Sequence, residues 1–433
     1  MIVYCSFITN RLRYICDFVG KELTGKPFEL TDSKEVFVNF SGPGINYSLE
    51  KITADDFWLK PHSLLAEKEI KQQTIDYSEV NDQPSFFKTG GDFPFDIFAA
   101  SFYLLSRYEE FLPYQKDTYG RYPHESSVAF NKNFLGKPLV NIWVQHFKAK
   151  LKQKFPFFPF HYSEFTFLPT YDIDEAYSYK HKQWWRRTGA GIIDLLKGNL
   201  KKFLLRRKVL DGEQSDPFDS FDWIDDLHCQ HKINPRYFFL VPEKTGKYDK
   251  NILPNKASLQ VLLRQHADKY RIGVHPSWQS GDKPSLIKKE IQTIEDITGI
   301  KIISSRQHFI RFTLPATYRH LLAAGIKEDF SMGYGSINGF RASVSCPFYW
   351  YDLEREKQTE LLLWPFCYME ANSFFEQKLT PSQALQEMRH YYQQVKNING
   401  AFVSIWHNTF LGTDEKFKGW REIYKQFIEE TAG

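Results

Sequence analysis

FTFLPTYDID, at residues 165–174, is an apolar run that leads into two aspartates, Asp172 and Asp174. Six similar runs follow it along the chain: RYFFLV (236–241), RIGVH (271–275), KIISSRQHF (301–309), DFSMGY (329–334), LLLWPFCYM (361–369) and AFVSIWHN (401–408). Helical or loop-rich segments separate the runs. Short buried strands that alternate with helices predict an α/β fold with a parallel sheet or barrel.

Residues 1–160 lack this alternation and predict a separate, smaller domain. Two helix candidates occur there, PFDIFAASFYLLSRYEEFL (94–112) and VNIWVQHFKAKLKQKF (140–155), together with short strand-like pieces. The proline-rich run FPFFPF that follows is typical of a connection between domains. We therefore expect an α+β domain of unknown role over 1–160 and an α/β domain over 161–433. Within 1–160, the charged residues Arg107, Glu109 and Glu110 are predicted to be solvated or to cap a helix.

Composition excludes several classes of protein. The net charge of +4 is too small to predict nucleic acid as the main partner. The five cysteines are scattered, and without a CxxC pair they indicate neither a disulfide framework nor a thiolate zinc site. The N-terminus lacks the features of a secretory signal, and no apolar run is long enough to span a bilayer. We expect a cytoplasmic protein.

Residues 182–208, KQWWRRTGAGIIDLLKGNLKKFLLRRK, interrupt the alternating pattern with a basic and apolar segment. Aromatic and leucine residues beside lysine and arginine residues are what an anchor on a membrane surface needs. The alternative is a helix that packs on the sheet and exposes a basic face to water. The first interpretation predicts peripheral contact with the inner membrane.

Side chains that can bind a metal stand at the ends of three of the apolar runs. The carboxyl edge of parallel strands is where sites assemble. Neighbouring strands lie about 5 Å apart, so His275 and His308 could face each other there. Together with Asp174 they would form a site of two nitrogens and one oxygen for a divalent metal, with zinc as the expected ion.

The remaining polar residues at these ends suggest acid and base catalysis. Asp172 points to the same side of an extended chain as Asp174 and could serve as a general base. Arg306 could hold the Asp172 carboxylate in its ionised form. If the last strand pairs with the first, His407 returns to the neighbourhood of Asp172 and could serve as the general acid.

The order TYDID, GVHPS, SRQH, EDFSMGY and SIWHN resembles the NodB-type polysaccharide deacetylases of carbohydrate esterase family four. The similarity is greatest to the bacterial branch in which an N-terminal domain precedes the barrel. It covers about 165–430 and, weakly, 1–160 through LLSRYEEF. This resemblance implies a distorted (β/α)7 barrel and metal-dependent removal of N-acetyl groups from amino sugars. It also implies roles for five residues: base (Asp172), metal carboxylate (Asp174), first metal histidine (His275), arginine that orients the base (Arg306) and acid (His407).

One position departs from the family pattern. The second metal histidine of the family follows the first by four residues, and here that position is Gln279. Three alternatives remain open: His308 takes its place, Gln279 or water binds the metal, or no metal binds. The arginine segment differs as well, because SRQHF stands where the family usually has Arg-x-Pro-Tyr.

The expected function is therefore that of a zinc-dependent hydrolase acting on an N-acetylated glycan or a lipid-linked sugar. Trp406, Arg341, Tyr334 and Phe340 are predicted to form the wall that binds the sugar. Two alternatives compete with this function: a metal-independent hydrolase of cyclic amides or formamides on the same barrel, for which Gln279 is the main support, and a non-catalytic scaffold that binds glycans.

Overall fold

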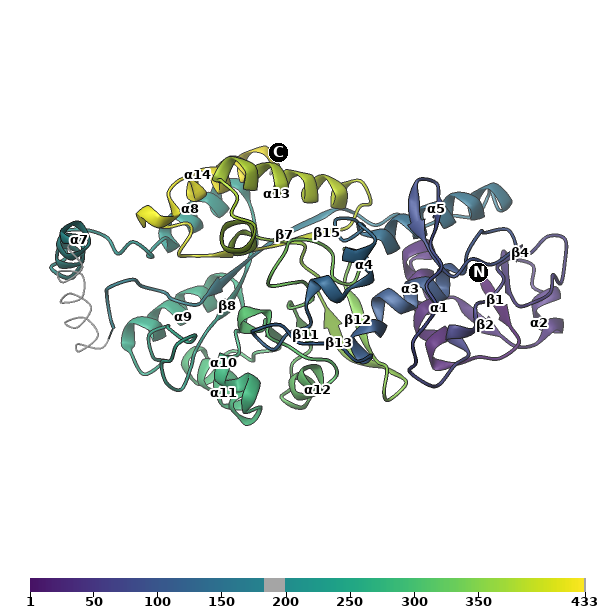
Figure 1. The fold of residues 1–433 in the computed structure, drawn as a ribbon, viewed down its shortest axis with the longest axis horizontal. Helices are drawn as coiled ribbons and strands as arrows, with labels where there is room; N and C mark the ends of the chain where they lie inside the picture. The colour runs from purple at the N-terminus through teal and green to yellow at the C-terminus, as the bar shows by residue number, and fades with distance from the viewer. Residues whose placement is uncertain (183–198, 432–433) are drawn as a thin grey trace.

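The structure of the chain is a computed structural model that describes residues 1–182 and 199–431. Figure 1 shows an elongated molecule with the N-terminal region at one end and a larger α/β region beside it. One continuous cluster of buried apolar side chains runs through both regions. The two regions therefore share a hydrophobic core.

The N-terminal region is built on a parallel sheet in the order β2-β1-β3-β4. Its strands are β1 (Ile2–Cys5), β2 (Glu29–Thr31), β3 (Gly44–Tyr47) and β4 (Phe57–Trp58), and an antiparallel pair is formed by β5 (Ser78–Val80) and β6 (Gln83–Ser85). The helices are α1 (Asn10–Thr24), α2 (Lys34–Val38), α3 (Ile97–Leu105), α4 (Val128–Asn131) and α5 (Leu139–Lys154). The predicted helix over 94–112 is shorter than expected because Asp96 caps its start and Arg107 adopts a left-handed conformation after its end.

The larger region contains a nine-stranded sheet in the order β12-β13-β11-β10-β9-β8-β7-β15-β14. Its strands are β7 (Thr166–Ile173), β8 (Arg236–Phe239), β9 (Arg271–Val274), β10 (Ser304–Ser305), β11 (Glu328–Asp329), β12 (Phe348–Asp352), β13 (Lys357–Leu363), β14 (Tyr368–Met369) and β15 (Ala401–His407). Neighbouring strands are parallel except for β12 and β13. Six of the seven apolar runs contain a strand and the seventh begins at the last residue of β11, so the predicted α/β class is confirmed.

The predicted closure of the barrel is not seen in the strand pairing. Among the described residues, no pairing joins β14 to β12 or β13, and the sheet keeps two edges. The antiparallel strand β12 was also not predicted. The apolar run 361–369 contributes to two strands, because residues 364–367 separate β13 from β14.

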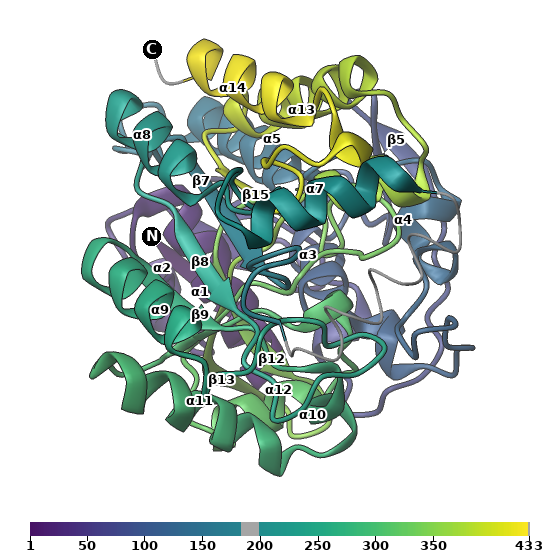
Figure 2. The ribbon, with the colours of Figure 1, turned by 90° about the vertical axis from the view of Figure 1, so that its left-hand side faces the viewer.

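Helices surround this sheet, as the end-on view in Figure 2 shows. They are α8 (Phe221–His231), α9 (Ala257–Lys269), α10 (Trp278–Asp282), α11 (Ser285–Thr298), α12 (Ala316–Ala323), α13 (Pro381–Lys396) and α14 (Trp420–Thr431). On α14 the buried side chains recur at intervals of three and four residues, from Trp420 and Ile423 to Phe427, so one face of the helix packs on the sheet.

A buried network of charges joins the two regions. Arg107 Nε donates to Glu110 Oε1 at 2.8 Å, and Arg341 donates to both oxygens of Glu110 at 2.9 and 2.6 Å. Arg107 also pairs with Glu109 at 2.8 Å. The prediction that Arg107, Glu109 and Glu110 are solvated or capping charges was wrong, since all three are buried and paired. Arg341, more than 200 residues later in the chain, provides the partner that this prediction lacked.

Part of the basic segment 182–208 lies outside the described residues, namely 183–198. Its described remainder forms most of α7 (Leu200–Leu210), which lies at the far end of the molecule in Figure 1. Within the described ranges, no helix has the length and apolar character that crossing a membrane requires.

Candidate active site

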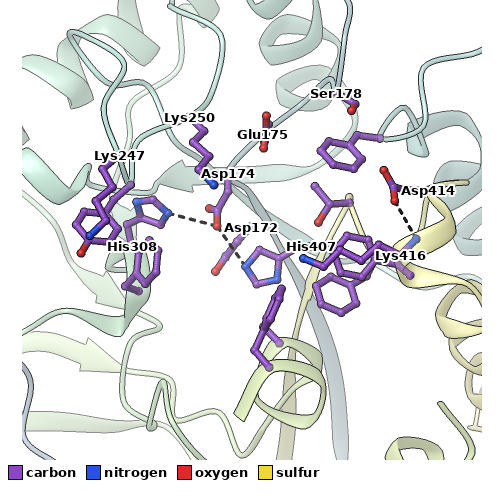
Figure 3. A pocket seen from close by; sticks show the side chains of 18 of the residues that line it. Asp172, Asp174, Glu175, Ser178, Lys247, Lys250, His308, His407, Asp414 and Lys416 are labelled. Atoms are coloured by element: carbon purple, nitrogen blue, oxygen red, sulfur yellow. Dashed lines mark hydrogen bonds and ion pairs between the residues drawn. The ribbon is translucent and has the colours of Figure 1, made fainter. Parts of the chain in front are cut away.

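A pocket of about 1890 Å³ opens at the carboxyl ends of the parallel strands. The predicted residues Asp172, Asp174, His275, His308 and His407 all line it. Figure 3 shows His308 and His407 pointing at Asp174 from opposite sides. The structure thus brings together side chains that follow four different strands.

Strand pairing places the first and last of these residues side by side. β15 pairs with β7 along its whole length, and His407 lies opposite Asp172. This confirms the predicted pairing of the last strand with the first. Side chains alternate across a strand, so Tyr171, next to Asp172, points the other way and bonds to His228 of α8 at 2.7 Å. Asp172 is left facing the pocket.

Asp174, His275 and His308 form a cluster that could hold a metal ion. One ligand atom from each residue lies within 4.8 Å of the other two. Nε2 of His275 is 3.0 Å from Asp174 Oδ1, and Nε2 of His308 is 3.4 Å from Asp174 Oδ2. Both histidines are buried, whereas the Asp174 side chain remains 29% exposed. The cluster is therefore open toward the pocket on one side.

Hydrogen bonds determine which nitrogen of each histidine faces Asp174. His275 Nδ1 donates to the carbonyl oxygen of Arg306 at 2.6 Å, and His308 Nδ1 donates to Asp249 Oδ1 at 3.3 Å. In a neutral imidazole this leaves a lone pair on Nε2. Two such lone pairs and a carboxylate that face one another repel unless a proton or a metal cation lies between them. The donor set therefore fits a divalent cation.

The charges around the cluster lead to the same conclusion. Burial alone would lower the pKa of His308, but the carboxylates of Asp174 and Asp249 outweigh it and raise the pKa to about 9. Burial would raise the pKa of Asp174, yet His308 and His275 hold it well below its ordinary value. Asp174 is thus ionised near neutral pH, and positive charge is favoured beside it.

Asp172 is held by the arginine that the sequence predicted. Arg306 Nη1 donates to Asp172 Oδ1 at 2.9 Å, and its Nε donates to the carbonyl oxygen of Phe330 at 3.0 Å. The guanidinium is fully buried and lies 4.6 Å from the centre of the Phe238 ring. The second oxygen of Asp172 lies 3.9 Å from His275 Nε2. One carboxylate oxygen is therefore anchored and the other is directed at the metal cluster.

His407 depends on Glu370, a residue that the sequence analysis missed. Glu370 Oε1 accepts hydrogen bonds from the backbone nitrogen of His407 at 2.7 Å and from its Nδ1 at 2.6 Å. Burial alone would lower the pKa of His407, but the Glu370 and Asp174 carboxylates raise it well above its ordinary value. Nε2 of His407 points at Asp174 Oδ2 from 3.4 Å. The imidazole therefore carries a proton into the pocket near neutral pH.

Gln279 contacts Asp249 rather than the cluster. Its Nε2 donates to Asp249 Oδ2 at 3.0 Å and to the carbonyl oxygen of Lys244 at 2.9 Å. The same Asp249 carboxylate orients His308. Gln279 thus affects the cluster only through Asp249, and His308 supplies the second imidazole of the cluster.

The predicted sugar-binding wall was wrong. Trp406, Arg341, Tyr334 and Phe340 are each at most 1% exposed, and none of them lines the pocket. Trp406 alternates with His407 along β15 and points outward to α14, 4.6 Å from the Tyr424 ring centre. Phe340 packs on α13, and Arg341 and Tyr334 belong to the charge network between the two regions.

Other aromatic residues line the pocket instead. On one side the Tyr119 and Phe309 rings stack with centres 5.6 Å apart, beside Tyr248. The opposite side contains Phe375, Phe410 and Phe417. Flat apolar faces of this kind match the C–H faces of sugar rings. Tyr119 belongs to the N-terminal region, which therefore contributes to the pocket.

Comparison with known proteins gives three findings. A model described as a family of unknown function (DUF7033) matches residues 1–156. No curated protein matches the chain at a significant level. Two solved structures are similar: a putative polysaccharide deacetylase from Mycobacterium smegmatis (13% identity, TM-score 0.40, 63% of this chain and 85% of that chain) and the polysaccharide deacetylase Bc1974 from Bacillus cereus (10% identity, TM-score 0.32, 62% and 88%). At TM-scores this low, the side chains of the site must carry the functional proposal.

Proposed function

We propose that this chain is a zinc-dependent hydrolase that removes N-acetyl groups from amino sugars of a glycan or of a lipid-linked precursor. The observation that carries the proposal is the convergence of three units in one pocket. These units are the metal cluster, the pair of Asp172 with Arg306, and the pair of His407 with Glu370. Amide hydrolysis needs an electrophilic centre, a base and an acid, and each unit supplies one of them.

Asp174, His275 and His308 would hold the zinc ion, which would supply polarisation of the acetamide carbonyl. The chain's own residues move the protons. Arg306 donates to one oxygen of Asp172 and fixes the position of this carboxylate, so that its second oxygen can accept a proton from the attacking water. His407 enters the reaction protonated and donates to the leaving nitrogen from its place beside Asp172. The aromatic walls are the surfaces on which the sugar rings stack.

The test measures acetate release from N-acetylated oligosaccharides by protein purified without an affinity tag, together with zinc content. We expect about one zinc ion per chain and loss of most activity in Asp172→Asn, because general bases contribute roughly 10²–10⁴-fold. Glu376→Gln, an exposed carboxylate elsewhere in the pocket, is the matched control and should retain activity. An unchanged rate in Asp172→Asn would remove Asp172 as the base. No acetate release by the wild type would favour the scaffold, and amide hydrolysis without bound metal would favour the cyclic-amide hydrolase.

We also propose that α7 contacts an anionic membrane surface and brings the pocket close to a lipid-linked substrate in the cytoplasm. Leu200 and Leu204 are 57% and 47% exposed, and Val209 is the one described α7 residue that is buried. The same helix also carries lysine and arginine residues. An exposed apolar stripe beside basic side chains is suited to the boundary between headgroups and acyl chains.

A further inference from the structure

Five lysine side chains that form no ion pair with the described residues line the pocket. They come from three separate segments: Lys201 and Lys202 from α7, Lys247 and Lys250 from the loop after β8, and Lys416 from the short helix η6 (Glu415–Phe417). Within the part of the chain that the structure describes, none of these five lysines forms an ion pair. Lys182, by contrast, is paired with Glu175. These five ammonium groups thus have no carboxylate at ion-pair distance among the described residues.

Lys250 and Lys416 are the inner members of this group. Figure 3 shows their side chains extending into the pocket from opposite sides, with Asp174 and His407 between them. The Lys416 ammonium lies over the rings of Phe375 and Phe417, 4.5 and 5.0 Å from their centres, which gives it a defined position. Burial lowers the pKa of Lys416, Asp414 opposes this effect, and the positive charge of Lys250 lowers the pKa further. The positive charges of the two ammonium groups are therefore felt in the same part of the pocket.

We propose that these lysines bind the phosphate groups of a diphosphate-linked N-acetyl amino sugar. This inference rests on the proposed function and names the substrate class of that same site. Like charges that share a space without counterions repel each other, and an anion between them removes the repulsion. A diphosphate brings several negative charges and many acceptor oxygens, and lysine is an established phosphate ligand. A neutral oligosaccharide would leave the lysines without an ion-pair partner.

Two sources of this chemistry must be distinguished, a nucleotide-linked and a polyprenyl-linked sugar. Both place a diphosphate next to the anomeric carbon, so both match the inner lysines. The exposed Leu200 and Leu204 lie beside Lys201 and Lys202 on α7, and this arrangement favours the lipid. Comparing rates on the two substrates separates the sources.

The first experiment measures binding of inorganic pyrophosphate by calorimetry at low salt. The full chain is treated with a chelator beforehand, because pyrophosphate also binds zinc. Lys250→Gln/Lys416→Gln should weaken binding at least about tenfold, since hydrogen bonds to charged groups are lost. The control, Lys327→Gln/Lys425→Gln, removes two exposed and ion-paired lysines outside the pocket and should change affinity less than about twofold. Equal affinity in the wild type and the inner double variant would overturn the inference.

The second experiment compares kcat/KM for acetate release from a neutral oligosaccharide, a nucleotide-linked sugar and a polyprenyl diphosphate-linked sugar. The inner double variant should lose a much larger factor in kcat/KM on the diphosphate substrates than on the neutral one. If the neutral substrate is preferred and the variant has no effect, the phosphate inference is wrong while the proposed function stands. If no substrate releases acetate, the proposed function fails, and pyrophosphate binding still decides whether the lysines form an anion site.

Discussion

Replacing His308 by alanine should remove most of the affinity for zinc, whereas replacing Gln279 should not. His308 directs Nε2 at Asp174 Oδ2, and Asp249 fixes this orientation. Gln279 occupies the position at which the resembling family has its second metal histidine, yet its amide bonds to Asp249 and to a backbone carbonyl. The pair of variants therefore asks which of the two residues holds the metal.

The two losses differ by orders of magnitude. A structural zinc ion contributes about 10–16 kcal/mol at neutral pH. If the three protein ligands share this energy equally, losing one costs about 3–5 kcal/mol, or roughly 10²–10⁴-fold in affinity. Gln279→Ala removes one hydrogen bond to Asp249, which is worth about 1 kcal/mol, or roughly fivefold. His308 keeps its own bond to Asp249 in that variant.

Zinc affinity is measured by competition with a chromogenic chelator at neutral pH. Circular dichroism and the Tm of the metal-free proteins show whether each variant is folded, so that loss of metal is not confused with loss of structure. Wild-type affinity in a folded His308→Ala variant would refute the assignment of His308. An equally large loss in Gln279→Ala would show that Gln279 is itself a ligand.

Three further predictions concern other parts of the molecule. Glu370→Gln removes the charge that raises the pKa of His407. Because the acid works below its pKa and fails above it, the alkaline limb of the kcat–pH profile should move to lower pH. Glu110→Gln leaves the buried Arg341 guanidinium without a carboxylate and Arg107 with Glu109 alone, so the free energy of unfolding in urea should fall by about 3 kcal/mol. Leu200→Ser/Leu204→Ser should reduce flotation with anionic vesicles at unchanged Tm, because both side chains are exposed. If the wild-type protein does not float with anionic vesicles, the membrane proposal is contradicted.

The residues at strand ends could be found from the sequence because parallel strands present their carboxyl ends at one edge. This rule located Asp172, Asp174, His275 and His407, and pairing of the last strand with the first put His407 opposite Asp172. The same rule should have found Glu370, which directly follows β14. It was missed because residues 361–369 were taken as one strand, although residues 364–367 divide them into two.

Other parts of the site had no pattern from which to predict them. Asp249 lies in a loop, and its contacts with His308 and Gln279 depend on the folding of three separate segments. Trp406 directly precedes His407, but adjacent residues of a strand face opposite sides, so its ring points away from the pocket. Tyr119 belongs to a region that has no strand in the nine-stranded sheet, so its place in the pocket depends on packing between the two regions.

The ion pairs between the two regions constrain how the chain is made on the ribosome. Glu110 accepts two hydrogen bonds from Arg341, which is translated 231 residues later. At roughly 5–20 residues per second, Glu110 waits about 10–50 s for this partner. During that interval the nascent N-terminal segment holds an incompletely neutralised carboxylate and apolar surface that the later sheet will cover. Slow codons between these positions would lengthen the exposure, and a ribosome-associated chaperone would be most useful in this window.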